Sequence, residues 1–407
     1  MGTRFRFLAG LLVAVLLMCF SACKTSGSKP APSTGALFVT AQGDSSVSAF
    51  SIDLSTGKLS AAGSGVATGN TPSAMILAPS GNALFVANSN PAVPPNSPPC
   101  TLPSPGTITA YTVKADGTLT AVSGNSAARF IPLSMTTDSG GHFLFVTNQG
   151  LQCNAPSGTI SVFSIQDTTL TEVSGSPFPS AAPLASSGTG PAAVAVTPDG
   201  KFLYVANQFD ATVTKYSVDT TSGALTQGLS IPVGTAPSAL AITPDGGFLY
   251  VANSGSSNVS AFAVCNQVLT SCNDPNSPDG SLTVVAGSPF SAGLEPVSIV
   301  AAPSGKFLYV VNRLSNQISE YKISIGTGAL TANTQATIST GANPVWVAVQ
   351  TGTSTVTATG GITDFLYAAN LGAASISVYS FDSTLGVLAL VGSPVSTGGQ
   401  PSAIATK

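Results

Sequence analysis

The chain has 407 residues, with only 7% charged side chains (13 Lys or Arg and 16 Asp or Glu) and a formal net charge of −3. Because it has no basic run to neutralise phosphates, we do not expect it to bind nucleic acid. It has a single histidine and no Cys-x-x-Cys pair, so the spacing of a metal site is missing, and we expect neither a metal nor a cofactor.

Residues 1–22 are typical of a secretory signal. Arg4 and Arg6 precede an apolar stretch, residues 7–20, that is too short to cross a ~30 Å hydrocarbon core. The stretch leads into Phe20-Ser21-Ala22-Cys23, which resembles a bacterial lipobox, although Phe20 stands where Leu is usual. The resemblance implies that Cys23 is lipidated and that the protein is exported and sorted to the outer membrane. Ordinary signal cleavage is the alternative.

Residues 23–35 are predicted to be the lipidated cysteine and a flexible polar tether, because Ser, Thr, Gly, Pro and Lys dominate them. We expect the protein to contact the membrane through this lipid anchor only. The folded part of the chain is predicted to cover residues 36–407.

A short apolar motif recurs seven times along this folded part. Its copies are LFVTA (37–41), LFVAN (84–88), LFVTN (144–148), LYVAN (203–207), LYVAN (249–253), LYVVN (308–312) and LYAAN (366–370). The aromatic positions are 47, 60, 59, 46, 59 and 58 residues apart. A unit repeated at such a period cannot bury its own faces, so the units must stack on one another.

The fourth repeat shows most clearly what one unit contains. An extended run begins at Pro191, a Pro-Asp-Gly turn follows at 198–200, and a second strand spans 202–206. Residues 212–218 alternate as a third strand, and 225–229 form a fourth. Four strands in about 46 residues without helical periodicity are typical of a propeller blade.

A proline opens the first strand of every repeat. The seven are Pro72, Pro132, Pro191, Pro237, Pro296, Pro344 and Pro401. Proline tolerates the first residue of an edge strand, so these mark the inner strands beside a central channel. The last strand, 401–406, has no blade of its own, whereas the first repeat lacks an inner strand. We therefore predict an all-β, seven-bladed propeller of four-stranded antiparallel blades, closed by 401–406 as the inner strand of the first blade.

The FLYVAN copies (202–207 and 248–253) and the TPDG turns (197–200 and 243–246) resemble the YVTN-repeat proteins and the seven-bladed propeller lactonases. That family includes 6-phosphogluconolactonases, and the resemblance spans about residues 36–407. It implies the propeller fold and, as one activity, lactone hydrolysis. These motifs describe the scaffold, however, and a scaffold does not identify a reaction.

Few charged side chains fall on the face where the inner strands begin. Glu295 precedes Pro296, and Arg313 follows the second strand of the same blade, so we expect the two to pair at the channel rim. Together with Arg129 they are the candidate catalytic residues: the carboxylate activates water and an arginine polarises the lactone carbonyl. The alternative is an ordinary surface ion pair.

Two further features are candidates for ligand binding. One is the ring of asparagines that end the second strands: Asn88, Asn148, Asn207, Asn253, Asn312 and Asn370. The other is Trp346 on the inner strand of the seventh blade, as a stacking platform. The alternatives are structural: asparagine stabilises turns, and the tryptophan packs in the core.

An exported chain meets an oxidising compartment, where cysteines pair. We predict the disulfides Cys100–Cys153, between insertions of neighbouring repeats, and Cys265–Cys272, across one short excursion.

Two functions compete. The first, which we expect, is a non-catalytic binding or scaffold protein on the cell envelope, a monomer with an unidentified protein or glycan ligand; a face rich in Ser, Thr, Asn and Gly favours it. The second is a lactonase acting on a sugar or other lactone at the channel mouth. A phosphorylated lactone would need several Lys or Arg side chains, of which only Arg129 and Arg313 are available.

Overall fold

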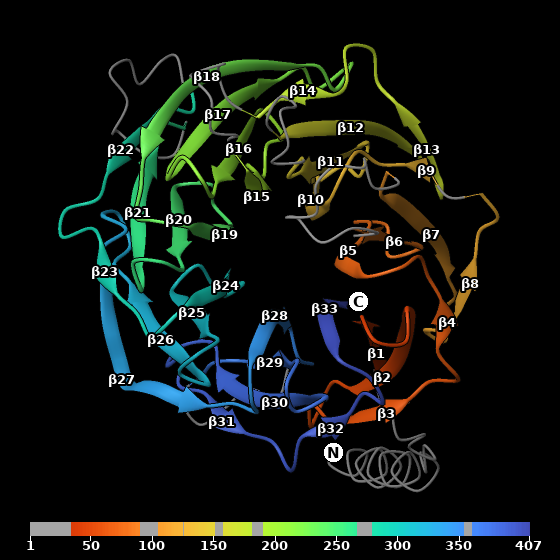
Figure 1. The fold of residues 1–407 in the computed structure, drawn as a ribbon. Coiled ribbons are helices and arrows are strands. Elements are labelled where there is room, and N and C mark those ends of the chain that lie inside the picture. The colour runs from red at the N-terminus through yellow and green to blue at the C-terminus, as the bar shows by residue number, and fades with distance from the viewer. Residues whose placement is uncertain are drawn as a thin grey trace, which may run out of the picture. The chain divides into compact units, whose positions relative to one another are not determined.

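The computed structural model of the chain describes residues 34–89, 105–124, 126–150, 158–180, 190–266, 279–353 and 360–407. Thr34–Lys407 form one compact unit, in which seven antiparallel sheets surround a central opening (Figure 1). The predicted seven-bladed propeller is therefore confirmed. The predicted signal and most of the tether lie outside the described residues, and the first strand begins at Thr34, inside the predicted tether. No helix in the described ranges is long and apolar enough to span a bilayer.

We number the blades 1 to 7 along the chain. The inner strands, in this order, are β33 (Pro401–Thr406), β5 (Pro72–Leu77), β10 (Pro132–Thr137), β15 (Pro191–Val196), β19 (Pro237–Ile242), β24 (Pro296–Ala301) and β28 (Pro344–Gln350). The second strands are β1 (Thr34–Ala41), β6 (Ala83–Asn88), β11 (Phe143–Asn148), β16 (Phe202–Asn207), β20 (Phe248–Asn253), β25 (Phe307–Asn312) and β29 (Thr363–Asn370). Every inner strand begins at the proline that predicted it.

The third strands are β2 (Ser46–Asp53), β7 (Thr107–Val113), β12 (Thr159–Gln166), β17 (Thr212–Val218), β21 (Asn258–Val264), β26 (Gln317–Ile323) and β30 (Ser375–Asp382). The outer strand is continuous in blades 4 and 6, as β18 (Leu225–Pro232) and β27 (Leu330–Ser339). In the other blades it consists of two pieces: β3 (Leu59–Ala61) and β4 (Val66–Ala67), β8 (Leu119–Ala121) and β9 (Ser126–Ala127), β13 (Thr169–Glu172) and β14 (Phe178–Pro179), β22 (Leu282–Val284) and β23 (Phe290–Ser291), β31 (Ala389–Leu390) and β32 (Val395–Ser396).

The break in the outer strand has a local cause that the sequence prediction of four strands missed. Between the two pieces, each broken blade carries a glycine with a positive φ, a conformation that glycine adopts without a steric cost. The five are Gly63 (92°), Gly124 (90°), Gly175 (86°), Gly287 (86°) and Gly392 (65°). Gly228 in the continuous β18 stays within the strand. The left-handed conformation of these glycines therefore accounts for the interruption of the outer strand in these five blades.

The second strands hold the core, because they are buried on both faces between neighbouring blades. In β16, β20 and β25 all six residues are buried. In the four motifs that carry a tyrosine, its hydroxyl also donates to the next blade; examples are Tyr204 to the carbonyl of Gly280 at 2.6 Å and Tyr309 to that of Gly386 at 2.8 Å. Stacking of the repeats is thus both apolar and hydrogen-bonded.

The ring closes where the sequence predicted. β33 pairs with β1 in antiparallel register from Leu37–Thr406 to Ala41–Pro401. The Ser402 hydroxyl donates to the carbonyl of Pro72 in blade 2 at 2.8 Å and shares a 2.8 Å bond with the Thr40 hydroxyl. The C-terminal strand therefore joins blade 1 to blade 2.

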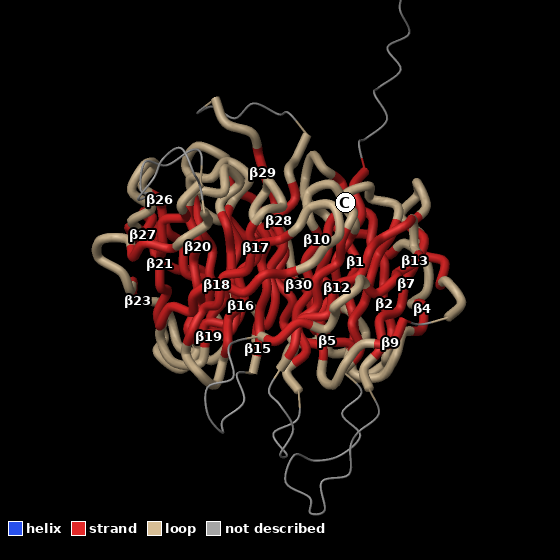
Figure 2. Tube along the Cα trace, turned by 90° about the horizontal axis from the view of Figure 1, so that it is seen from above, coloured by secondary structure: helices blue, strands red, loops and turns tan. Residues whose placement is uncertain are grey.

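The blades direct their loops to the two faces of the ring (Figure 2). On one of these faces, which we call the proline face, the inner strands begin and the second strands end. The pairing of Pro72 with Asn88, and of Pro296 with Asn312, places these ends side by side. Any side chain just before an inner-strand proline or just after a second-strand asparagine therefore lies on the proline face.

Candidate functional site

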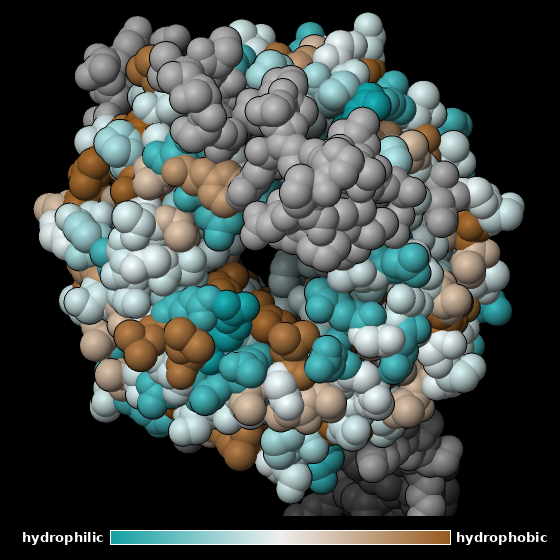
Figure 3. Space-filling model, in the orientation of Figure 1, coloured by the Kyte–Doolittle hydropathy of each residue, from teal (hydrophilic) through white to brown (hydrophobic). Residues whose placement is uncertain are grey.

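On the proline face, hydrophilic side chains gather beside the central opening over β24 and β25, with hydrophobic side chains next to them (Figure 3). Glu295 immediately precedes β24 and Arg313 immediately follows β25. Leu294 and Leu314, their chain neighbours, are 59% and 62% exposed. Blade 6 thus presents one charged pair with an apolar border at the channel mouth.

The two charged side chains pair, as the sequence predicts. Nε of Arg313 donates to Oε2 of Glu295 at 3.0 Å, and Nη2 donates to Oε1. The backbone supports the pair, because the amide of Arg313 donates to the carbonyl oxygen of Glu295 at 2.9 Å. The side chains of Arg313 and Glu295 are 41% and 22% exposed, so both are within reach of a ligand. A two-point pair of this kind has a defined orientation.

Glu295 also has a left-handed backbone, with φ of 56°. The same conformation precedes the inner-strand proline in five other blades, at Thr71, Ile131, Gly190, Ala236 and Asn343. Such values are uncommon outside glycine and often mark functional sites. Here they recur around the ring, so the conformation belongs to the blade and not to one site.

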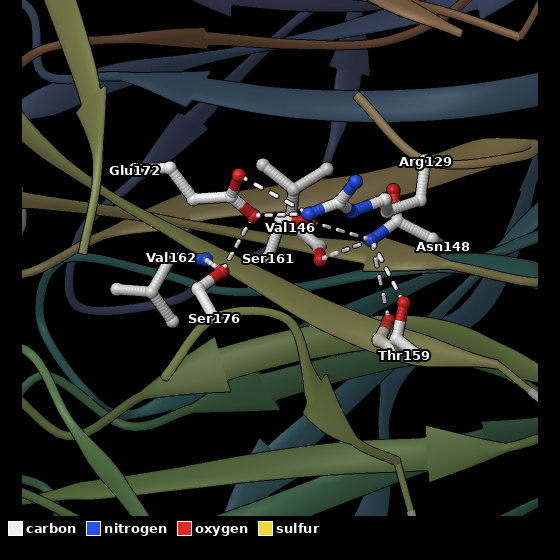
Figure 4. Close-up of polar contacts among 8 residues, drawn as sticks. All are labelled: Arg129, Val146, Asn148, Thr159, Ser161, Val162, Glu172 and Ser176. Atoms are coloured by element: carbon white, nitrogen blue, oxygen red, sulfur yellow. Dashed lines mark hydrogen bonds and ion pairs between the residues drawn. The ribbon is translucent and has the colours of Figure 1, made fainter. Parts of the chain in front are cut away.

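Arg129 does not join this pair. Its Nη2 donates to both carboxylate oxygens of Glu172, at 3.1 and 3.2 Å (Figure 4). Glu172 ends β13 at the outside of blade 3, and it also accepts a bond from the Ser176 hydroxyl at 2.9 Å. Blades 4 and 5 separate this cluster from Glu295 along the ring. The structure therefore places Arg129 in a surface ion pair, the alternative that the sequence left open.

The six candidate asparagines are almost fully buried, at 0 to 1% exposure. Each donates its side-chain amide to a hydroxyl on the third strand of its own blade; examples are Asn207 to Thr214 at 2.8 Å and Asn370 to Ser377 at 2.9 Å. Figure 4 shows the same arrangement at Asn148, which donates to Ser161 at 3.0 Å. These amides point into the blades and not to the channel mouth, which favours the structural role over a ligand ring.

Trp346 lies on β28 and is partly buried. Its side chain packs against three separate hydrophobic clusters, which join blades 7 and 1, 1 and 2, and 2 and 3. Its side chain therefore packs against more blades than a residue between two neighbouring blades would.

Of the four predicted disulfide cysteines, only Cys265 lies within the described residues. It is 3% exposed after β21 and takes part in a disulfide. Cys23, Cys100, Cys153 and Cys272 lie outside the described residues, so the lipidation and both pairings stay predictions. Among the residues that the structure describes, no three His, Cys, Asp or Glu side chains come close enough to hold a metal ion.

The structure also reveals a buried acid that the sequence reasoning missed. Glu320 on β26 is fully buried opposite Tyr309. Its Oε2 accepts a bond from the amide of Leu388 in blade 7 at 3.1 Å, while Oε1 has no hydrogen-bond partner among the described residues. Burial raises the pKa of this carboxyl to about 7. An alignment of the repeats would have indicated this residue. The position opposite the aromatic residue of the motif holds alanine in β7 and β21 (Ala110 and Ala261) but an acid in β26.

Glu320 makes the stability of the fold depend on pH. The folded pKa is above the ordinary value of 4.5, so the unfolded chain releases this proton first and stability falls as pH rises from about 4.5 through about 7. We expect a loss of roughly 2.5 kcal/mol between about pH 5 and pH 8, measured by urea unfolding. Glu320→Gln should remove this slope, whereas the surface variant Glu172→Gln should keep it. An equal slope in Glu320→Gln would assign the pH dependence to other groups.

Comparison with known proteins agrees with this architecture. The sequence matches the family described as "Lactonase, 7-bladed beta-propeller" over residues 156–274 and 276–407. None of the curated proteins compared with the chain matches it.

Several solved structures share the fold over nearly their whole length. A proposed 6-phosphogluconolactonase from Bacteroides uniformis is 19% identical, with a TM-score of 0.69 over 92% of this chain and 99% of that one. A second, from Bacteroides fragilis, is 21% identical, with a TM-score of 0.70 over 92% and 98%. A periplasmic gluconolactonase from Pseudomonas aeruginosa is also 21% identical, with a TM-score of 0.70 over 92% and 99%. At this identity the likeness shows the fold alone.

Proposed function

Because the chain belongs to the seven-bladed β-propeller lactonase family, we propose that it hydrolyses a lactone on the proline face. The observation that carries the proposal is the two-point pair of Glu295 and Arg313 beside the central opening. Of the two functions weighed from the sequence, family membership favours the lactonase over the scaffold.

The pair contains the two groups that ester hydrolysis needs. Glu295 retains acceptor sites on its oxygens while it is paired, so it can take a proton from water as the water attacks the lactone carbonyl. The N–H groups of Arg313 that do not contact Glu295 can donate to the carbonyl oxygen as negative charge develops on it. The ring C–O bond then breaks, the ring oxygen receives the proton, and the product is the open hydroxy acid.

The charge distribution favours an unphosphorylated substrate. A phosphate carries about two negative charges near neutral pH, and its sites gather Lys and Arg. Of the two arginines considered for phosphate binding, Arg313 is already paired with Glu295 on the proline face. Arg129 is paired with Glu172 in blade 3. The relatives described as 6-phosphogluconolactonases and as a periplasmic gluconolactonase are consistent with a sugar-derived lactone.

The location that we propose is the cell envelope, with Cys23 as the lipid anchor. The support is the signal-like segment 1–22 and the lipobox-like residues 20–23. A location outside the cytosol also fits an unphosphorylated substrate, because phosphosugars are cytosolic metabolites.

A binding or scaffold role without catalysis is the second candidate. The observation that favours it is that both oxygens of Glu295 already accept bonds from Arg313. In this role the pair fixes the rim of blade 6 and the ligand is an unidentified protein or glycan.

A hydrolysis screen separates the two. The full chain, purified in detergent, is incubated with gluconolactone, 6-phosphogluconolactone and simple aliphatic lactones, and acid release is followed with a pH indicator. We expect turnover above the spontaneous rate with unphosphorylated lactones and a lower kcat/KM for the phosphorylated one. No turnover with any lactone would support the scaffold instead.

A further inference from the structure

The only tryptophan of the chain stands where every other blade has a small residue. Trp346 is two residues after the inner-strand proline, opposite the residue before the second-strand asparagine. The equivalent residues are Ala74, Ser134, Ala193, Ala239, Ser298 and Ala403. Six blades pack well without a large side chain here, so blade packing does not explain the indole.

Its contacts place the indole in the central channel. The cluster between blades 2 and 3 includes Ala74 and Met135, and the cluster between blades 1 and 2 includes Met75 and Ala403. These residues lie on inner strands β5, β10 and β33. Trp346 starts on β28 in blade 7 and packs against both clusters, so its indole reaches past the neighbouring blade 1 to blade 2. Trp346 therefore lines the channel on the side of blades 1 and 2, and the residue is partly exposed.

The residues that carry the indole and the carboxylate belong to neighbouring blades: Trp346 lies on the inner strand β28, and Glu295 directly precedes the inner strand β24. β24 and β28 are adjacent, and the amide of Val347 donates to the hydroxyl of Ser298 at 3.2 Å. Val347 follows Trp346 directly, and Ser298 is three residues beyond Glu295. Both features are thus near the proline-face end of the strands, where Figure 3 shows the surface hollowed at the centre of the ring.

We propose that Trp346 is the surface on which a cyclic, hydroxylated and uncharged ligand stacks, with Glu295 and Arg313 at the edge of that ligand. An aromatic face attracts the C–H face of a saturated ring, and a few convergent polar groups then fix its orientation. Resting on the proposed lactone hydrolysis, this specifies the substrate as an unphosphorylated sugar lactone. Trp346 determines specificity in this arrangement and takes no part in proton transfer.

The single tryptophan supplies a direct test of binding. Emission from Trp346 in the full chain, excited where tyrosine does not absorb, is recorded during titration with fresh gluconolactone, with methyl β-glucoside as a stable ring, and with open-chain gluconate. We expect a saturable change with the two rings and at least about tenfold weaker binding of gluconate, equivalent to ~1.4 kcal/mol. If neither cyclic ligand changes the emission of Trp346, the proposal is wrong.

Two variants test the aromatic face itself. Trp346→Phe keeps a flat ring, whereas Trp346→Leu keeps apolar packing without one. Relative to wild type, we expect KM for gluconolactone to rise about threefold in the first and about tenfold in the second, with kcat nearly unchanged. If Trp346→Leu does not fold, the titration of the wild type still decides.

The outcomes separate this inference from the proposed function. A saturable fluorescence change without hydrolysis supports ring binding and contradicts the lactonase. Hydrolysis with an unchanged KM in Trp346→Leu supports the lactonase and contradicts stacking on the indole.

Discussion

Deleting residues 401–407 is expected to unfold the whole propeller and not only its first blade. The deletion removes β33, whose Ala403 and Ile404 are 0% and 2% exposed. Ile404 belongs to the cluster between blades 7 and 1, and Ala403 to the one between blades 1 and 2, so two blade interfaces lose contacts at once. We expect a loss of at least about 4 kcal/mol, much of the stability of an ordinary domain. Thermal unfolding followed by circular dichroism measures it.

The deletion also exposes the inner edge of β1, which can pair with another chain, so aggregation should accompany the loss of stability. Lys407→Ala is the matched control. Lys407 bonds to Ala36 through its main chain, with N–O distances of 2.8 and 3.2 Å, and the variant retains both bonds. It should unfold within about 0.5 kcal/mol of wild type. A deleted chain that melts like wild type would show that the ring does not depend on its closing strand.

The fold was largely predictable because a few residues recur in every repeat and mark where its strands begin and end. Proline is tolerated at the start of an edge strand, so the seven prolines identify the inner strands. The first repeat lacks an inner strand, and the last strand of the chain has no blade of its own, so the two complete each other. The broken outer strands were less predictable. Gly63 and Gly228 occupy the same part of a blade, and only the backbone shows that the first ends a strand while the second continues it.

The site was predictable only where the pairing of two consecutive strands brings its residues together. Glu295 and Arg313 adjoin two strands that pair, so the register brings them together. The partner of Arg129 is Glu172 in the outer strand of the same blade, which no local spacing indicates. Trp346 packs against clusters at three blade interfaces, and the environment of Glu320 combines two blades. Such relations come from the closed ring and not from one repeat.

In the proposed lactonase, Glu295→Gln and Arg313→Ala are each expected to lower kcat/KM for gluconolactone by about 10² or more. Loss of the carboxylate removes the group that accepts the proton of water, an effect typically about 10²–10⁴-fold. Loss of the guanidinium removes donors to the developing oxyanion, typically about 10²–10³-fold. Because both side chains belong to one pair, the double variant should be little slower than either single variant. Initial rates over a range of lactone concentrations measure all three.

The chain offers a matched control in its other arginine–glutamate pair. Arg129→Ala and Glu172→Gln break a pair of similar exposure, 47% and 33% against 41% and 22%, that lies in blade 3. They should leave kcat/KM within about twofold of wild type, because this pair does not adjoin the proposed site in blade 6. The fold should also be retained, because an exposed pair contributes no more than ~1 kcal/mol to folding. Equal losses in both sets of variants would mean that general surface charge, and not the pair beside β24 and β25, supports the reaction. Turnover that survives in Glu295→Gln would place the base elsewhere on the proline face.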